Sequence, residues 1–244
     1  MDRQEPKDGW VATRPSMIIL QPTSLCNLNC AYCYLPGRKS KNEMPLPVAR
    51  AIAEGINPEW MESAPLELVW HGGEPLAVGP TQFEERLKPF VALQNSGLVQ
   101  HVIQTNTTLI TDEWCELLLK HGVAIGVSID GPPTLNQNRV DWQGKPAFTR
   151  IMNGIAKLIE RDVDFNVIAV VDQAATDSIH QILDFFAVLR PRSIALNLEE
   201  REGVNLHDGS PSPRKARTLW RDVSSMAPSP PPRPITVASL YKLW

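Results

Sequence analysis

Apolar segments rich in valine and isoleucine recur along the chain and alternate with longer segments of helical periodicity. The sequence predicts strands at 17–21, 66–70, 100–105, 124–129, 165–171 and 193–198. It predicts helices at 47–56, 81–93, 111–121, 148–161 and 178–189. Strands that alternate with helices favour a parallel sheet joined by right-handed crossovers. We therefore expect an α/β fold, an incomplete (β/α)6 TIM-like barrel, with an open doubly wound sheet as the alternative.

The composition of the chain changes near residue 208. The strand–helix alternation occupies residues 17–208, which we expect to form the core domain, and residues 1–16 form an extension before it. Residues 209–244 are dense in proline, serine and arginine. Such a composition predicts a short irregular tail that is disordered or linker-like.

Charge and hydropathy exclude two classes of partner. The 24 basic and 27 acidic residues give a formal net charge of -3, so no polybasic surface for nucleic acid or anionic membrane is expected. Residues 1–10 carry acids, bases and a proline rather than an apolar signal segment. No window reaches the roughly 18 apolar residues of a membrane helix. We expect a cytoplasmic protein.

Three of the four cysteines lie close together, directly after the first predicted strand. Cys26, Cys30 and Cys33 have the spacing C-x3-C-x2-C. Three thiolates on one short loop can converge on a cuboidal iron–sulfur cluster, whose fourth iron then has no protein ligand. A zinc site is the alternative, with His71 at the end of the second strand as a candidate fourth ligand. Cys115 lies in an apolar helical pattern and is expected to be a small buried hydrophobe.

Groups that suit a small polar ligand follow the next two strands. Two glycines, Gly72 and Gly73, allow a close backbone approach, and the Glu74 carboxylate can accept hydrogen bonds from an ammonium group. The alternative is a plain glycine turn capped by Glu74, followed by Pro75. Asn106 at the end of the third strand is a candidate contact for ribose or substrate, with an ordinary turn as the alternative.

The loop CNLNCAYCY resembles the cluster motif of the radical S-adenosylmethionine (SAM) enzymes, with Tyr32 as the aromatic residue before the third cysteine. The resemblance implies a radical SAM barrel and a [4Fe–4S] cluster whose open iron is chelated by the amino and carboxylate groups of SAM. One electron from the cluster would cleave SAM to methionine and a 5′-deoxyadenosyl radical, which abstracts hydrogen from a substrate. Cys26, Cys30 and Cys33 would hold the cluster.

The same resemblance extends to the SAM contacts. The segment Gly72–Pro75 resembles the part of these enzymes that holds the SAM amino group. The pattern SIDGP followed by Arg139 resembles that of peptide-modifying members, in which the residue matching Ser128 contacts the ribose and the arginine contacts the carboxylate. Leu196 on the last predicted strand is a candidate contact for adenine, with core packing as the alternative.

Several segments together resemble one subgroup, the peptide maturases that carry a SPASM domain. The chain is most similar to cyclophane-forming maturases of glycine-rich-repeat peptides in the segments QPTSLCNLNCAYCYLPGR, VWHGGEPL, QTNTTLI, GVSIDGP and NLEEREGVN. This implies a radical cross-link between an aromatic ring carbon and a β-carbon of a ribosomal precursor peptide. It also implies an electron donor such as ferredoxin or flavodoxin. No catalytic base is identified.

The chain departs from this pattern in two places. No cysteine follows Cys115, so cysteine-ligated auxiliary clusters are excluded for this chain, and the tail after residue 208 suggests a truncated or frame-shifted SPASM region. Asn136 stands where such enzymes usually carry a histidine. The alternative functions are a catalytically incomplete iron–sulfur or SAM-binding module and, third, a zinc-binding protein.

Overall fold

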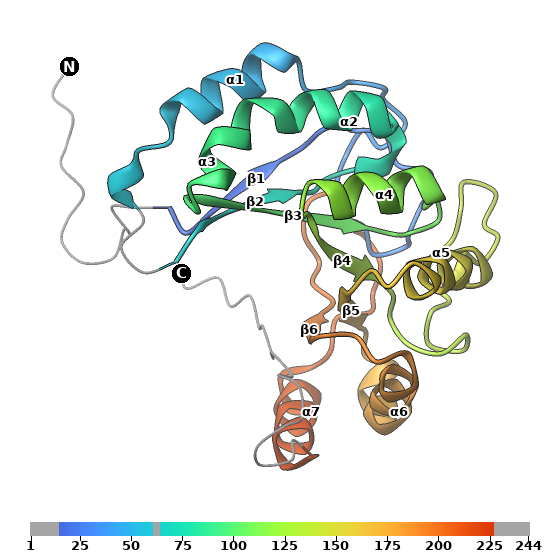
Figure 1. Cartoon of the computed structure of the whole chain (residues 1–244). Helices are drawn as coiled ribbons and strands as arrows, with labels where there is room; N and C mark the ends of the chain where they lie inside the picture. The colour runs from blue at the N-terminus through green and yellow to red at the C-terminus, as the bar shows by residue number, and fades with distance from the viewer. Residues whose placement is uncertain (1–14, 61–63, 227–244) are drawn as a thin grey trace, which may run out of the picture.

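The computed structural model describes residues 15–60 and 64–226 and shows a curled sheet with helices along its outer side (Figure 1). The strands are β1 (Met17–Leu20), β2 (Leu66–Trp70), β3 (Val99–Thr105), β4 (Ala124–Ser128), β5 (Phe165–Val171) and β6 (Ile194–Leu198). The helices are α1 (Leu46–Gly55), α2 (Pro80–Leu87), α3 (Val91–Asn95), α4 (Asp112–Lys120), α5 (Phe148–Glu160), α6 (Ile179–Leu189) and α7 (Pro213–Met226). The short 3-10 helices are η1 (Pro58–Trp60), η2 (Pro75–Val78), η3 (Lys88–Phe90) and η4 (Ala175–Ser178).

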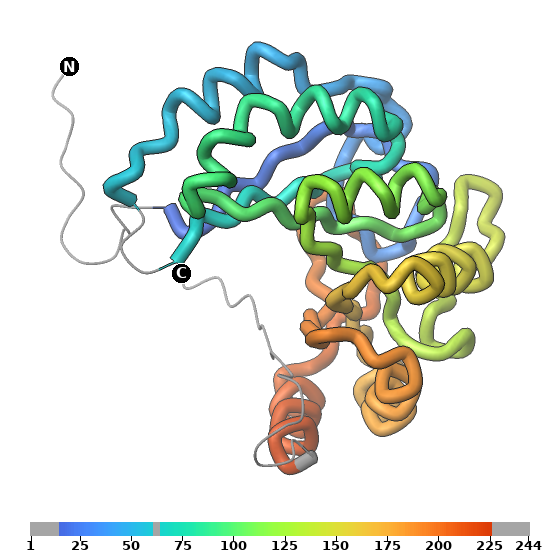
Figure 2. Tube along the Cα trace, in the orientation of Figure 1, coloured from blue at the N-terminus to red at the C-terminus, as the bar shows by residue number. Residues whose placement is uncertain are grey.

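The strand order decides between the two predicted architectures. Within the described residues the sheet has six strands, all parallel, in the order β1-β2-β3-β4-β5-β6. A doubly wound sheet reverses its direction of growth at a switch point, and this sheet does not. Successive right-handed crossovers in one direction keep the helices on one side, so the sheet curls into half a barrel (Figure 2). The predicted partial (β/α)6 barrel is confirmed.

Alternate strand positions build the core between the sheet and the helices. On β2, Leu68 and Trp70 have no exposed surface. The Trp70 ring meets Phe83 of α2 edge-on at 5.1 Å and Phe90 at 6.1 Å between ring centroids. Its indole Nε1 donates to Nδ1 of His101 at 3.1 Å, so the one polar atom of this buried ring has a partner.

The other face of the sheet is much less covered. Ile19 of β1 pairs in register with Val69, which pairs with Val102, so the three side chains lie on the inner face of the half-barrel. Ile19 is 64% exposed. The concave face of the sheet therefore remains open.

Among the helices of the described residues, none is long and apolar enough to cross a membrane.

The predicted helix at 81–93 is interrupted. α2 ends at Leu87, η3 follows, and α3 begins at Val91. Pro89 lies at the break, and proline has no N–H for a helical hydrogen bond while its ring collides with the carbonyl four residues earlier. The apolar periodicity continues across the break, which is why the pattern alone predicts a single helix.

The prediction of an irregular tail is wrong for its first part. Residues Pro213–Met226 form α7, which packs through the buried side chains of Ala216, Leu219 and Val223. These positions follow the spacing i, i+3, i+7 of one helix face. The proline and arginine content of the segment conceals this spacing. Residues 227–244, the remainder of the predicted tail, lie outside the described residues, as do residues 1–14.

Two helical glycines give a matched test of the packing between α5 and the loop after β3. A Cβ on Gly154 would lie 2.2 Å from the carbonyl oxygen of Thr107, whereas a Cβ on Gly55 of α1 would meet nothing within 4 Å. Gly154→Ala should lower the free energy of unfolding by about 1–3 kcal/mol through overpacking. Gly55→Ala should leave it unchanged or raise it by up to about 1 kcal/mol. Urea denaturation measures both, and equal midpoints for the two variants would contradict the packing described.

Candidate functional site

The three clustered cysteines lie on a loop that is fixed by backbone hydrogen bonds on one side. The loop follows β1 at the carboxyl edge of the sheet and returns alongside itself. Ser24 N donates to Asn42 O at 2.9 Å, and Cys26 N donates to Arg38 O at 2.8 Å. Cys26, Cys30 and Cys33 are all free and half-buried. The sequence therefore forms a preorganised loop that presents three thiols.

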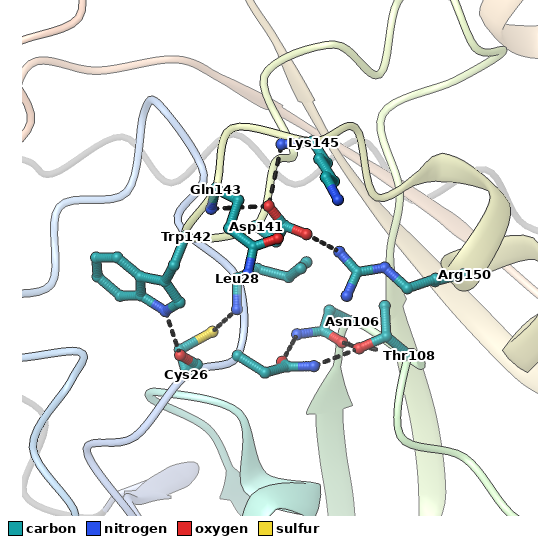
Figure 3. Close-up of polar contacts among 10 residues, drawn as sticks. Cys26, Leu28, Asn106, Thr108, Asp141, Trp142, Gln143, Lys145 and Arg150 are labelled. Atoms are coloured by element: carbon teal, nitrogen blue, oxygen red, sulfur yellow. Dashed lines mark hydrogen bonds and ion pairs between the residues drawn. The ribbon is translucent and has the colours of Figure 1, made fainter.

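The loop after β4 holds the cysteine loop from the other side. Asn29 N donates to Val140 O at 2.7 Å, and Ala31 N donates to Asn138 O at 2.8 Å. The indole Nε1 of Trp142 donates to the carbonyl oxygen of Cys26 at 2.9 Å (Figure 3). The cysteine loop is thus held by hydrogen bonds along both edges.

The environment of the thiols suits a positively charged metal group. Burial, followed by the negative charge of Glu74, raises the pKa of the Cys26 thiol to about 12, and burial also raises the pKa of Cys30. The backbone N–H of Leu28 donates to the Cys26 sulfur at 3.4 Å. Buried thiols become thiolates when a metal ion supplies the compensating charge. The donor set and its surroundings therefore fit an iron–sulfur cluster.

A mononuclear zinc site receives no support from the geometry. Among residues 15–60 and 64–226, no three cysteine, histidine, aspartate or glutamate side chains converge on a point that could hold a single metal ion. His71, the candidate fourth ligand, is half-buried, and burial lowers the pKa of its imidazole. Cys115 is free and 1% exposed within α4, as predicted for a small core residue.

The two glycines after β2 approach the cysteine loop itself. A Cβ on Gly73 would lie 2.6 Å from the carbonyl oxygens of both Thr23 and Leu25, and Gly73 has a positive φ of 62°. The backbone N–H of the next residue, Glu74, donates to Leu25 O at 2.7 Å. Only glycine allows this contact, so Gly73 joins the turn after β2 to the loop of the cysteines. A Cβ on Gly72 would likewise meet the Gln21 side chain, at 2.9 Å.

Glu74 is a buried carboxylate that has no cationic partner among residues 15–60 and 64–226. Its Oε1 accepts hydrogen bonds from Thr105 Oγ1 at 2.6 Å and Leu76 N at 3.1 Å, and its Oε2 accepts from Asn106 N at 2.8 Å. Burial nevertheless raises the pKa of Glu74 to about 7 against these three hydrogen bonds. Pro75, which is buried, begins η2 directly after it. The site therefore holds an acid that a bound cation would ionise.

Asn106 links the end of β3 to the cysteine loop. Its Nδ2 donates to Asn27 Oδ1 at 2.9 Å, and its Oδ1 accepts from Thr108 Oγ1 at 2.6 Å (Figure 3). The Asn27 side chain in turn donates to Thr108 Oγ1 at 2.7 Å. Asn27 lies directly after Cys26, so this network brings the predicted metal and cofactor residues together.

Ser128 lies at the end of β4 and has a partner that the sequence analysis did not identify. Gln104 Nε2 donates to Ser128 Oγ at 2.7 Å. A Cβ on Gly126 would lie only 2.1 Å from Gln104 Oε1, so the Gln104 side chain occupies the space that this glycine leaves free. A glycine inside a strand often indicates such a close approach. The glycine at position 126, inside a predicted strand, could therefore have indicated that a neighbouring side chain, that of Gln104, packs against it.

A second unpredicted residue, Asp130, organises the loop after β4. Arg139 donates to it from Nε at 3.0 Å and from Nη2 at 2.7 Å, and the Tyr32 hydroxyl donates to Asp130 Oδ2 at 2.6 Å. The backbone N–H of Val170 on β5 completes the set at 2.9 Å. The neighbouring carboxylate raises the pKa of Arg139 despite its burial. Arg139 thus already pairs with a carboxylate of the protein, and its predicted contact with the SAM carboxylate remains a prediction.

Two further residues of the sequence analysis, Leu196 and Asn136, are buried in the structure. Leu196 has no exposed surface and belongs to the hydrophobic core beside Ala169, which favours the alternative of core packing, and the adenine contact stays a prediction. Asn136, at the position of the missing histidine, is fully buried and accepts a hydrogen bond from Asp130 N at 3.0 Å. It therefore stabilises the same loop as Asp130.

Comparison with known proteins identifies the family. The model of the radical SAM superfamily matches residues 20–186. The serine-type anaerobic sulfatase-maturating enzyme of Klebsiella aerogenes is 31% identical over 200 residues, which cover 80% of this chain and 49% of that protein. An uncharacterised protein of Synechocystis is 35% identical over 199 residues, covering 78% of this chain and 49% of that protein. The chain spans about half the length of the curated relatives that it matches.

Solved structures share the fold. A structure of native anSMEcpe with bound AdoMet and the Cp18Cys peptide has a TM-score of 0.71 and 22% identity, covering 86% of this chain and 59% of that one. Streptococcus suis SuiB bound to the precursor peptide SuiA has a TM-score of 0.68 and 19% identity, and the match covers 93% of this chain and 49% of that one. Since the superfamily match extends over well over half of the residues and includes the three-cysteine loop, this chain belongs to the radical SAM superfamily.

Proposed function

We propose that the chain holds a [4Fe–4S] cluster through Cys26, Cys30 and Cys33 and binds SAM beside it, to modify a ribosomally synthesised precursor peptide. The observation that carries the proposal is the hydrogen-bonded network that joins the cysteine loop to the buried, unneutralised carboxylate of Glu74. The site combines three thiols that can bind iron with the Glu74 carboxyl group, which has no cationic partner among the described residues. Reduced thiols of this kind belong to a reducing cytoplasm, where we place the protein.

When bound, the cluster and SAM would supply the difficult chemistry, a 5′-deoxyadenosyl radical that abstracts hydrogen. The residues of this chain bind and orient them. In the proposal Glu74 receives the SAM ammonium group, and the turn Gly72–Pro75 positions that carboxylate. Ser128 with Gln104 and Asn106 provide hydroxyl and amide groups for the ribose. Tyr32 and Arg139 fix the loops around the cofactors.

The proposal of a peptide substrate is based on the proteins to which this chain is similar. Sulfatase-maturating enzymes and a precursor-peptide complex are among the similar proteins. Within this class we propose a carbon–carbon cross-link of the cyclophane type, because five segments of the sequence resemble such maturases. The second candidate is a cofactor-binding module that cleaves SAM but does not itself modify a peptide. Release of 5′-deoxyadenosine by reconstituted, dithionite-reduced protein supports both, and a mass change in a precursor peptide encoded nearby supports only the first.

The cluster ligands can be tested against the fourth cysteine. Cys33→Ala should abolish binding of about four irons per chain and the brown colour after anaerobic reconstitution, because the remaining two thiols cannot hold a cuboidal cluster. Cys115→Ala, the matched control in α4, should retain both. Iron analysis and visible absorption measure the outcome. A full iron complement in Cys33→Ala, or stoichiometric zinc in colourless wild-type protein, would contradict the proposal.

The role of Glu74 can be tested by binding alone. Glu74→Gln should weaken SAM binding to the reconstituted protein by roughly ten- to a hundredfold, the value of a hydrogen bond between charged groups of about 1.5–3 kcal/mol. Glu67→Gln is the control, since Glu67 lies on β2, the strand that precedes Glu74, and its carboxylate bonds only to Gln100 in the described structure. Equilibrium dialysis with labelled SAM measures both affinities. Unchanged affinity in Glu74→Gln would remove this residue from the site.

The stability of the cofactor-free protein should depend on pH through the same carboxyl group. Its pKa of about 7 in the folded state lies above the ordinary value of 4.5, so the folded chain retains a proton that the unfolded chain loses. The resulting stabilisation is complete below pH 4.5 and disappears as the pH rises through about 7, a difference of about 3 kcal/mol. Wild-type protein should therefore lose more stability than Glu74→Gln between pH 5 and pH 8 in urea titrations. Parallel pH profiles would show that Glu74 is not the titrating group.

A further inference from the structure

A solvent-exposed tryptophan lies directly against the carbonyl group of a cluster cysteine. Trp142 is 37% exposed, and its Nε1 donates to the Cys26 carbonyl oxygen at 2.9 Å. In Figure 3 the indole lies beside Cys26, on the side away from Asn106 and Thr108. The ring is therefore connected to Cys26 by one hydrogen bond and is open to solvent.

Cations surround this ring. The Lys39 Nζ lies 4.5 Å and the Arg38 guanidinium carbon 5.5 Å from the ring centre, and an Arg38 nitrogen also lies 3.4 Å from the Cys30 carbonyl oxygen. Lys145 lies three residues beyond Trp142 in the same tight turn and is exposed. We name Arg38, Lys39, Trp142 and Lys145 the cationic rim.

The rim keeps its positive charge. In the part of the chain that the structure describes, no carboxylate forms an ion pair with Arg38, Lys39 or Lys145. Asp141, the acid of the same turn, pairs with Arg150 at 3.1 Å and accepts hydrogen bonds from the backbone N–H groups of Gln143 and Lys145. A concentrated positive patch on a chain of net charge -3 is a feature that steers an acidic partner.

We propose that the cationic rim is the docking face for a small acidic electron-donor protein of the flavodoxin kind, and that Trp142 connects the docked donor to Cys26. The inference rests on the proposed function, because a cluster that cleaves SAM must receive one electron each time. That electron leaves the reduced flavin and enters the cluster through the indole, the hydrogen bond and the covalent bonds of Cys26. The flavin is oxidised by one electron, the cluster is reduced by one, and no bond of this chain forms or breaks.

The charge of the rim is tested by direct binding. The double variant Lys39→Glu/Lys145→Glu should slow association of an acidic flavodoxin with the reconstituted protein by roughly tenfold or more at low salt. Wild-type affinity should fall as ionic strength rises, because salt screens exposed charges. The matched control, Arg214→Glu/Arg217→Glu on α7, changes the charge by the same amount at exposed positions and should associate like wild type. Biolayer interferometry under nitrogen measures the rates.

The part played by Trp142 needs a second variant. Trp142→Phe retains an apolar ring but loses the N–H donor, so flavodoxin should bind with nearly unchanged affinity. At saturating donor, the bleaching of the cluster absorbance in stopped flow should nevertheless become several-fold slower. Reduction by dithionite, which needs no docking face, gives the reference rate for each variant.

The outcomes separate this inference from the proposed function. Equal association of the rim and α7 double variants would overturn the docking face, as would binding that is insensitive to salt. An acidic synthetic peptide that binds the rim while flavodoxin does not would also overturn it, in favour of a substrate contact. Wild-type protein that binds flavodoxin in a rim-dependent manner but fails to cleave SAM with dithionite would instead contradict the proposed function.

Discussion

The pairing of Asp130 with Arg139 holds together the loops on which the site depends. The Asp130 carboxylate receives the guanidinium, the Tyr32 hydroxyl and the Val170 backbone N–H, so it joins the cysteine loop, the loop after β4 and strand β5. A buried ion pair of this kind adds little net stability, because both charges must be desolvated. The ion pair instead fixes the geometry of the site, since the polar groups around Asp130 form defined hydrogen bonds with its carboxylate.

The contrast with Glu74 explains how the site is prepared for a ligand. Both carboxylates are buried at the carboxyl edge of the sheet, after β2 and β4, but Asp130 has a guanidinium beside it, whereas Glu74 has only hydroxyl and backbone donors among the described residues. Dipoles alone do not offset desolvation, so the Glu74 pKa stays raised. Asp130 is paired with a cation of the protein itself, whereas Glu74 is fully ionised only when a cation binds beside it.

The sequence predicted the fold well because its signals are local. Every predicted strand is present to within one residue or so at each end, since each is a short apolar run bounded by turn residues. The break at Pro89 and the helix α7 were missed because composition and periodicity point in opposite directions there. The cysteines, Glu74 and Asn106 were found as motifs at strand ends. Asp130 and Gln104 were not, because their roles depend on contacts with Tyr32, Arg139, Ser128 and Gly126, which lie on other segments.

The open inner face follows from the number of strands and from the residues that line it. A closed eight-stranded barrel fills its interior with side chains from all sides, whereas six strands leave an arc whose concave side has no opposing wall. On β4 and β6 that side carries Gly126 and Ala195, which cannot fill it. Beside them it carries the polar groups of Gln104 and Ser128, already bonded to each other. A concave face lined by small and polar side chains is poor as a core but suits a polar ligand, and the loops with Cys26 and Glu74 lie at its carboxyl edge.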